Sequence, residues 1–112
     1  MLIYKIFRRP EWDAFREAGL TEGAPVDVAD GFIHFSTSAQ VVETAAKHFA
    51  DESDLVLVAF DPDALGAALK WEPSRGGALF PHLYRRLALS EVVWDKSLPL
   101  GQAGHIFPEG ML

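Results

Sequence analysis

The hydrophobic and polar positions of this 112-residue chain alternate in short runs that are typical of strands. Residues 2–7 are rich in β-branched and aromatic side chains and predict a first strand. Residues 54–60 (DLVLVAF) form the strongest apolar run, which predicts a central strand buried on both faces. Further short strands are predicted over residues 31–35, 68–72, 83–87 and 92–95.

A first helix is predicted from Pro10 to Gly19. Proline is well tolerated in an opening helical turn, and glycine commonly follows the last turn. Three apolar residues recur between them at helical spacing: Trp12, Phe15 and Ala18. A single helical turn is also predicted to begin at Asp61 and to end near Gly66.

A second helix is predicted to begin after Thr37. Thr37 and Gln40 have the spacing of a capping box, in which side chains satisfy free backbone N–H groups. Its expected apolar face consists of Val41, Val42, Ala45, Ala46 and Phe49.

Two segments are predicted to be loops because of their glycine and proline content. They are residues 20–30 and residues 73–81. The second contains Gly76 and Gly77, which allow a backbone to approach a ligand closely.

Five or six short strands with two main helices between the early ones predict an α+β fold. One domain is expected over residues 1–98. Residues 99–112 are expected to form a C-terminal tail or an arm on the sheet. This tail either lies on its own domain or contributes to a dimer interface, so both a monomer and a homodimer stay open.

The composition of the chain argues against several classes of function. A net charge of −6 argues against general nucleic-acid binding, which requires an excess of Lys and Arg. The absence of cysteine excludes disulfides, thiolate zinc sites and a cysteine nucleophile. No apolar run approaches the roughly 18 residues of a membrane span, and the N-terminal charges follow the apolar stretch, unlike a signal peptide. We therefore expect a cytoplasmic protein without membrane contact.

Basic residues form two small groups within this acidic chain. Lys5, Arg8 and Arg9 form one group. The other consists of Arg75, Arg85 and Arg86. This distribution suits one anionic small molecule better than a polymer, although solvated surface arginines explain it equally well.

His34 is the most informative residue, because an imidazole interrupts an apolar strand just before a helix. His34 and Ser36 are expected to share an accessible face, while Ile33 and Phe35 enter the core. A histidine in this place can act as a general acid or base. Together with Thr37 and the following helix N-terminus it predicts a phosphate or ribose pocket. The alternative is a half-buried histidine that is hydrogen-bonded to backbone carbonyls.

A second histidine, His82, lies in the segment FPHLY. His82 and Tyr84 are expected to share a strand face that stacks on a planar ligand group, with Arg85 beside them. Glu72 is a candidate for orienting one of the histidines. The alternative is a packed aromatic cluster. His48 and His105 are expected to be solvated.

Two other chemistries have little support. His34 and His82 show no HxH or HExxH spacing, so no metal is expected. Ser36 does not lie in a GxSxG turn, which argues against a serine hydrolase.

Four segments together resemble the DUF952 family, small and mostly bacterial proteins of unknown function, over residues 2–98. They are residues 3–6 (IYKI), 31–37 (GFIHFST), 54–58 (DLVLV) and 80–84 (FPHLY). That family is in turn similar to the ADP-ribosyltransferase superfamily, especially the RNA 2′-phosphotransferases.

The resemblance implies a split, mainly antiparallel sheet that holds NAD, as substrate, in a cleft. By this analogy His34 and Ser36 would line the nicotinamide-ribose region, and Lys5 would be the basic residue of the first strand. We expect His34 and His82 to be the catalytic residues. The ligand-binding residues would be Lys5, Ser36, Thr37, Tyr84 and Arg85. The segment around Glu91 gives no secure match to the late glutamate of the transferases. The first hypothesis is therefore a domain that binds or processes NAD or a phosphorylated or ADP-ribosylated nucleotide. The alternative is a non-catalytic domain of the same fold that senses a small anion or docks to a protein.

Overall fold

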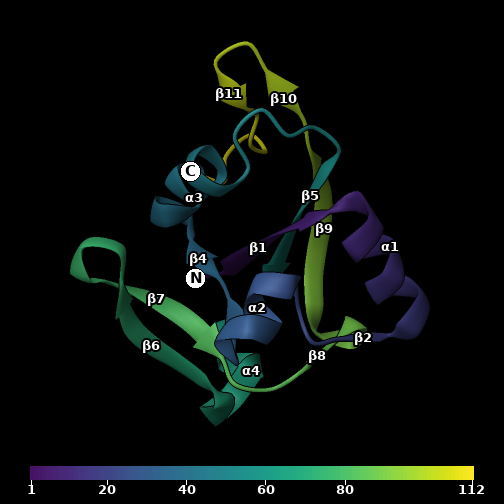
Figure 1. The fold of residues 1–112 in the computed structure, drawn as a ribbon, viewed down its shortest axis with the longest axis vertical. Helices are drawn as coiled ribbons and strands as arrows, with labels where there is room; N and C mark the ends of the chain where they lie inside the picture. The colour runs from purple at the N-terminus through teal and green to yellow at the C-terminus, as the bar shows by residue number, and fades with distance from the viewer.

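The computed structural model describes residues 1–112 except for the Arg75 side chain, so the predicted role of that side chain lies outside the described residues. Four antiparallel strands form the main sheet in the order β4-β1-β5-β9 (Figure 1). Their bounds are β1 Ile3–Arg8, β4 Ser36–Thr37, β5 Leu55–Phe60 and β9 Val92–Leu98. All six residues of β5 are buried between β1 and β9, which confirms the predicted central strand.

A second antiparallel sheet has the order β3-β7-β6. It consists of β3 Ile33–His34, β6 Leu69–Ser74 and β7 Ala78–Leu83. Of the strand predicted over residues 31–35, only Ile33 and His34 form a strand in this sheet. A division separates β3 from β4, which belongs to the main sheet. The division lies at Phe35, whose side chain is buried and whose N–H donates to the Pro81 carbonyl at 3.0 Å.

Two short strand pairs complete the β structure. β2 Leu20–Thr21 pairs with β8 Leu87–Ala88, and β10 Leu100–Gly101 pairs with β11 Gly104–His105. The mixed helices and mainly antiparallel sheets confirm the predicted α+β class.

The two main helices lie where the sequence predicts them. α1 runs over Arg9–Ala18 and ends at Gly19, whose φ of 77° is left-handed. α3 runs over Ser38–His48, and the Thr37 N–H donates to Gln40 Oε1 at 3.1 Å, as expected for a capping box. A short α4 over Pro62–Leu65 confirms the turn predicted after Asp61. Three 3₁₀ turns occur at η1 Gly66–Ala68, η2 Arg75–Gly77 and η3 Leu89–Glu91.

The loop prediction for residues 20–30 is wrong, because this segment contains β2 and a helix, α2 Pro25–Asp30. Pro25 opens the helix, and Gly31 closes it in a left-handed conformation with φ of 85°. These two signals were present in the sequence, but Gly23 and Asp30 gave the segment a loop composition.

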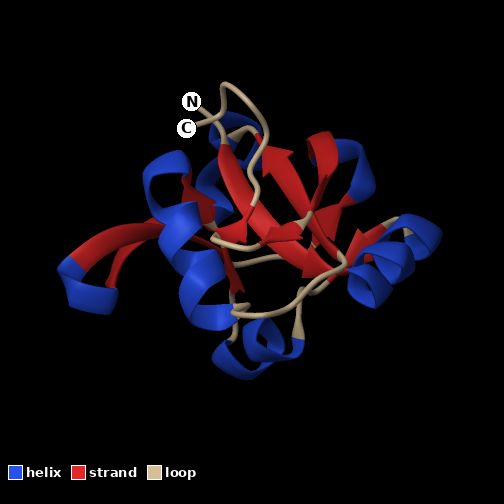
Figure 2. Ribbon diagram, turned by 90° about the horizontal axis from the view of Figure 1, so that it is seen from above, coloured by secondary structure: helices blue, strands red, loops and turns tan.

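The loop prediction for residues 73–81 is also wrong. β6 continues to Ser74 and β7 begins at Ala78, so the turn is limited to η2. Pro73 is tolerated because β6 is the edge strand of its sheet. Gly76 and Gly77 form the tip of a hairpin that projects from the body of the protein, and Figure 2 shows this projection from above. The segment predicted as a strand over residues 83–87 instead turns after Leu83 before β8 begins.

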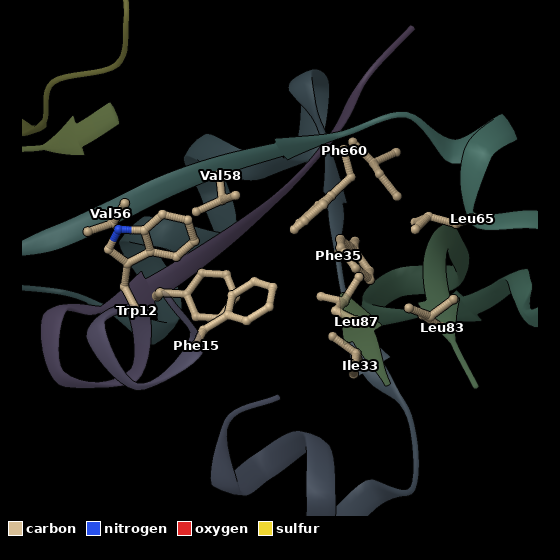
Figure 3. Packing of buried hydrophobic residues seen from close by; sticks show 12 residues of the cluster. Trp12, Phe15, Ile33, Phe35, Val56, Val58, Phe60, Leu65, Leu83 and Leu87 are labelled. Carbon is tan, nitrogen blue, oxygen red and sulfur yellow. The ribbon is translucent and has the colours of Figure 1, made fainter. Parts of the chain in front are cut away.

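Hydrophobic side chains fill both faces of the main sheet. On one face, Trp12 and Phe15 of α1 pack with Val56 and Val58 of β5 (Figure 3). On the other face, Val41 and Ala45 of α3 are buried with a second cluster, against which Phe107 and Met111 of the C-terminal segment pack. Two residues predicted for the α3 face, Val42 and Ala46, are exposed instead. Among the described residues, no helix has the length and apolar character required to cross a membrane.

Candidate functional site

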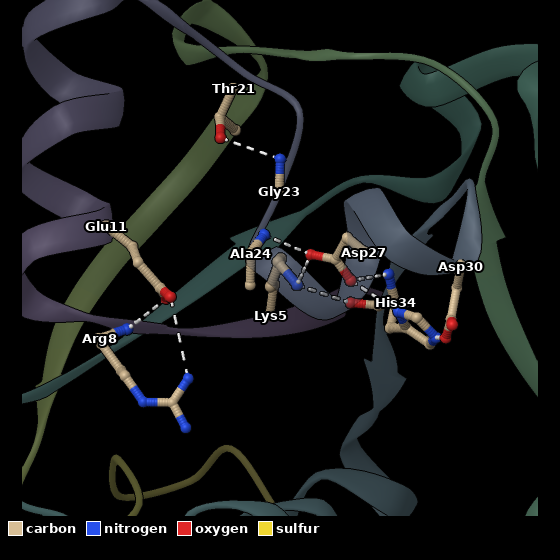
Figure 4. Close-up of polar contacts among 9 residues, drawn as sticks. All are labelled: Lys5, Arg8, Glu11, Thr21, Gly23, Ala24, Asp27, Asp30 and His34. Atoms are coloured by element: carbon tan, nitrogen blue, oxygen red, sulfur yellow. Dashed lines mark hydrogen bonds and ion pairs between the residues drawn. The ribbon is translucent and has the colours of Figure 1, made fainter.

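A buried ion pair connects β1 to α2. Lys5 Nζ lies 2.8 Å from Asp27 Oδ2, and the two residues are only 7 % and 1 % exposed. The same carboxylate oxygen accepts a hydrogen bond from the Ala24 N–H at 2.7 Å, which caps the first turn of α2. Figure 4 shows how Asp27 points back toward the strand. The pair therefore fixes the position of α2 against the main sheet.

Asp27 also orients His34. Its Oδ1 lies 2.6 Å from His34 Nδ1 and accepts a second hydrogen bond from the His34 backbone N–H at 3.0 Å. Lys5 Nζ donates to the His34 carbonyl at 3.3 Å. With Nδ1 directed to Asp27, the ring presents Nε2 as its second polar atom. Nε2 lies 3.0 Å from Oδ2 of Asp30, the last residue of α2.

The pKa of Asp27 is set by opposing effects. Burial disfavours the carboxylate, but the hydrogen bond from His34 and the charge and hydrogen bond of Lys5 outweigh it. The pKa of Asp27 falls from its ordinary value of 3.8 to about 2. A carboxyl group with a lowered pKa stabilises the fold above its unfolded-state pKa, and this contribution is lost as the pH falls through the folded-state value.

We therefore expect acid to weaken the fold through Asp27. The free energy of unfolding should fall by about 2 kcal/mol between pH 5 and pH 2 on account of this group. Urea unfolding at the two pH values measures the change. The Asp27→Asn variant is the control, because its residue 27 does not titrate. An acid sensitivity that is equal in both proteins would contradict the assignment.

His82 lies directly opposite His34 on the neighbouring strand. The two ring centroids are 5.5 Å apart, which is close enough for both histidines to contact one ligand. His82 is 5 % exposed, and its ring stacks on Phe32 at 4.2 Å. The cross-strand register of β3 and β7 thus brings the two histidines together.

Glu72 holds His82, as the sequence indicated. His82 Nδ1 lies 2.9 Å from Glu72 Oε1, and the Tyr84 hydroxyl donates to the same oxygen at 2.6 Å. These hydrogen bonds, first from Tyr84 and then from His82, lower the pKa of Glu72, and Glu72 in turn raises the pKa of Tyr84. His82 therefore has a carboxylate at Nδ1, as His34 does.

A cavity of about 760 Å³ adjoins both histidines. It lies among β1, α2, α3 and the β6–β7 hairpin, and we call it the cleft. Its polar wall includes Lys5, Asp27, Asp30, His34 and His82. Its apolar wall includes Val26, Phe35, Val41, Phe49 and Phe80. Within the described part of the chain, no three His, Asp or Glu side chains gather in a group that could hold a metal ion.

The predicted ligand-binding residues do not all reach this cleft. Lys5 and Ser36 line it. Ser36 is buried, and its hydroxyl oxygen lies 2.9 Å from the Thr44 hydroxyl oxygen. Thr37 lies outside the lining, and α3 faces the cleft with residues from Val41 onward rather than with its N-terminus. The helix N-terminus therefore does not contribute the predicted phosphate pocket.

Tyr84 and Arg85 line a separate, smaller cavity of about 440 Å³. Arg85 is held there by Glu91, with guanidinium–carboxylate distances of 2.7 and 3.0 Å. His48 is exposed, as predicted, and lines the cleft. His105 is not simply solvated, because its Nε2 lies 2.8 Å from the Glu52 carbonyl oxygen.

The chain matches a known protein family and solved structures. A family described as "Protein of unknown function (DUF952)" matches residues 6–95. The chain belongs to the DUF952 family. None of the curated proteins compared matches it.

Solved structures resemble this DUF952 domain closely. The crystal structure of protein CC0527 from Caulobacter crescentus is 54 % identical, with a TM-score of 0.90 over 94 % of this chain and 92 % of that one. The solution NMR structure of CC0527 is 55 % identical, with a TM-score of 0.84 over 93 % and 90 % of the two chains. The fold of this DUF952 domain is therefore shared with a bacterial protein.

Proposed function

We propose that this DUF952 domain binds a nucleotide-sized small molecule in the cleft and that His34 polarises the ligand or exchanges a proton with it. The supporting observation is the Asp27–His34 pair, in which a buried carboxylate orients an imidazole that lines a cavity. A carboxylate at Nδ1 fixes the tautomer in which Nε2 carries the chemistry, as in hydrolase triads. The resemblance to ADP-ribosyltransferases makes NAD, ADP-ribose and 2′-phosphorylated nucleotides the first ligands to test.

His82 extends this proposal, because its ring lies beside that of His34 and is oriented by Glu72. With Nδ1 of both rings held by carboxylates, a neutral imidazole can accept a proton at Nε2 while a protonated one donates a proton to the same ligand. The His34 side chain is about one-third exposed, so a ligand in the cleft can reach it.

Ligand binding is tested by thermal unfolding with each nucleotide. A ligand at 100 times its dissociation constant should raise the melting temperature by about 10 °C. The shift should be lost in His34→Gln and reduced in His82→Gln. His105→Gln is the matched control, because this histidine does not line the cleft. If no nucleotide raises the melting temperature of the wild-type protein, nucleotide binding is excluded.

A second candidate is binding without turnover. Glu91, in the segment compared with the late glutamate of the transferases, favours this candidate, because it does not line the cleft. Its carboxylate instead accepts hydrogen bonds from Arg85 and from the Ala88 N–H. Glu11 is the glutamate among the described lining residues, and it accepts a hydrogen bond from the Arg8 backbone. An assay for nicotinamide release from NAD separates the two candidates, since a pure binding domain gives a thermal shift but no product.

A further inference from the structure

Carboxylates flank His34 on both sides. Asp27 Oδ1 lies 2.6 Å from Nδ1, and Asp30 Oδ2 lies 3.0 Å from Nε2. A neutral imidazole donates from one nitrogen only, whereas an imidazolium donates from both. The arrangement around His34 is therefore the one that a doubly protonated ring satisfies with two charge-assisted hydrogen bonds.

When His34 is protonated at both nitrogens, the charges of this cluster balance only if Asp30 is included. Lys5 and a doubly protonated His34 carry two positive charges, and both contact the single negative charge of Asp27. Asp30 supplies the second negative charge at Nε2. Without Asp30, the cluster would have one positive charge in excess, at an atom on the wall of the cleft.

The two carboxylates differ in how firmly they are held. Asp27 is buried and receives hydrogen bonds from Ala24, Lys5 and His34. The Asp30 side chain is 47 % exposed, and His34 is its one polar partner among the described residues. Asp30 is also the last residue of α2, directly before Gly31. Asp30 can therefore leave Nε2 without breaking other described contacts.

The permanently charged cations that line the cleft already have partners. Of the described lining residues, Lys5 pairs with Asp27, and Arg8 pairs with Glu52 through hydrogen bonds of 2.7 and 3.0 Å. An incoming anion gains most at Nε2 of His34, because the contact with an exposed carboxylate is the easiest of these to exchange.

We propose that His34 Nε2 is the position at which the cleft binds a phosphate oxygen of its ligand and that Asp30 occupies this position in the free protein. This inference rests on the proposed binding of a nucleotide-sized ligand in the same cleft. Asp30 then acts as an internal competitor, and its removal should strengthen binding, whereas removal of an ordinary ligand contact weakens it.

The test compares Asp30→Asn with the wild-type protein by titration with inorganic phosphate and with ADP-ribose. We expect Asp30→Asn to bind both about tenfold more tightly, as expected when one competing charge-assisted hydrogen bond is removed. Glu17→Gln makes the same change in net charge on the exposed surface of α1, outside the cleft, and should change binding less than twofold. In the double variant Asp30→Asn/His34→Gln the gain should disappear.

The outcomes separate this inference from the proposed function. Wild-type binding that depends on His34, together with unchanged or weaker binding by Asp30→Asn, overturns the competitor role and leaves the proposed function in place. A gain that persists in the double variant also overturns it, because the anion would then bind away from Nε2. Failure of both wild type and Asp30→Asn to bind either probe overturns the competitor role, whereas the proposed function is overturned only if NAD and 2′-phosphorylated nucleotides also give no thermal shift.

Discussion

Asp27→Asn is expected to lower the free energy of unfolding by about 3–5 kcal/mol, the cost of breaking a buried ion pair by removing one partner. The substitution leaves the Lys5 ammonium buried without its counter-ion, because Lys5 is only 7 % exposed. It also weakens the hydrogen bonds that the carboxylate receives from Ala24 and His34. Urea unfolding monitored by tryptophan fluorescence at neutral pH measures the loss.

A double variant identifies the source of this loss. Lys5→Met/Asp27→Asn removes both charges while retaining a side chain of similar length at position 5. We expect it to recover part of the stability lost in Asp27→Asn, because no unpaired charge remains buried. If the double variant is as unstable as the sum of the two single variants, the coupling between Lys5 and Asp27 is negligible and the explanation is wrong.

Phe7→Ala is expected to lower the free energy of unfolding by about 3–5 kcal/mol, as is typical when a buried phenylalanine is truncated. Phe7 is 1 % exposed, and its ring centroid lies 5.7 Å from those of both Trp12 and Phe15. It therefore connects β1 to α1, and its truncation leaves a cavity beneath the helix. The midpoint of urea unfolding should shift to a lower concentration with little change in slope.

Val93→Ala is the matched surface control, because Val93 is half exposed on β9. We expect this substitution to change the free energy of unfolding by less than about 0.5 kcal/mol. A loss of less than about 1 kcal/mol in Phe7→Ala would show that α1 is not held by this aromatic cluster.

The sequence predicts those elements of the fold that depend on residues close together in the chain. The uninterrupted apolar run of β5 predicts a strand that is buried on both faces, because neither of its faces carries a charged side chain that would be costly to bury. Pro10 and Gly19 mark the ends of α1 because proline and glycine have backbone preferences of their own. These predictions need no knowledge of what the elements pack against.

The site was only partly predictable, because its key contacts join distant positions. Asp27 is one of several carboxylates in a segment of loop-like composition, and only the approach of Lys5 and His34 gives it a role. The proximity of His34 and His82 follows from the register of β3 against β7, which neither strand specifies alone. Arg85 is basic and close to His82 in sequence, but it pairs with Glu91 and lines the smaller cavity rather than the cleft.

The crossing of the chain at Phe35 has a mechanical consequence. His34 belongs to one sheet and Ser36 to the other, and both line the cleft. The width of the cleft is therefore tied to the angle between the two sheets, which the buried Phe35 helps to join. A molecule that contacts both His34 and Ser36 would link the two sheets across this crossing and restrain the angle between them.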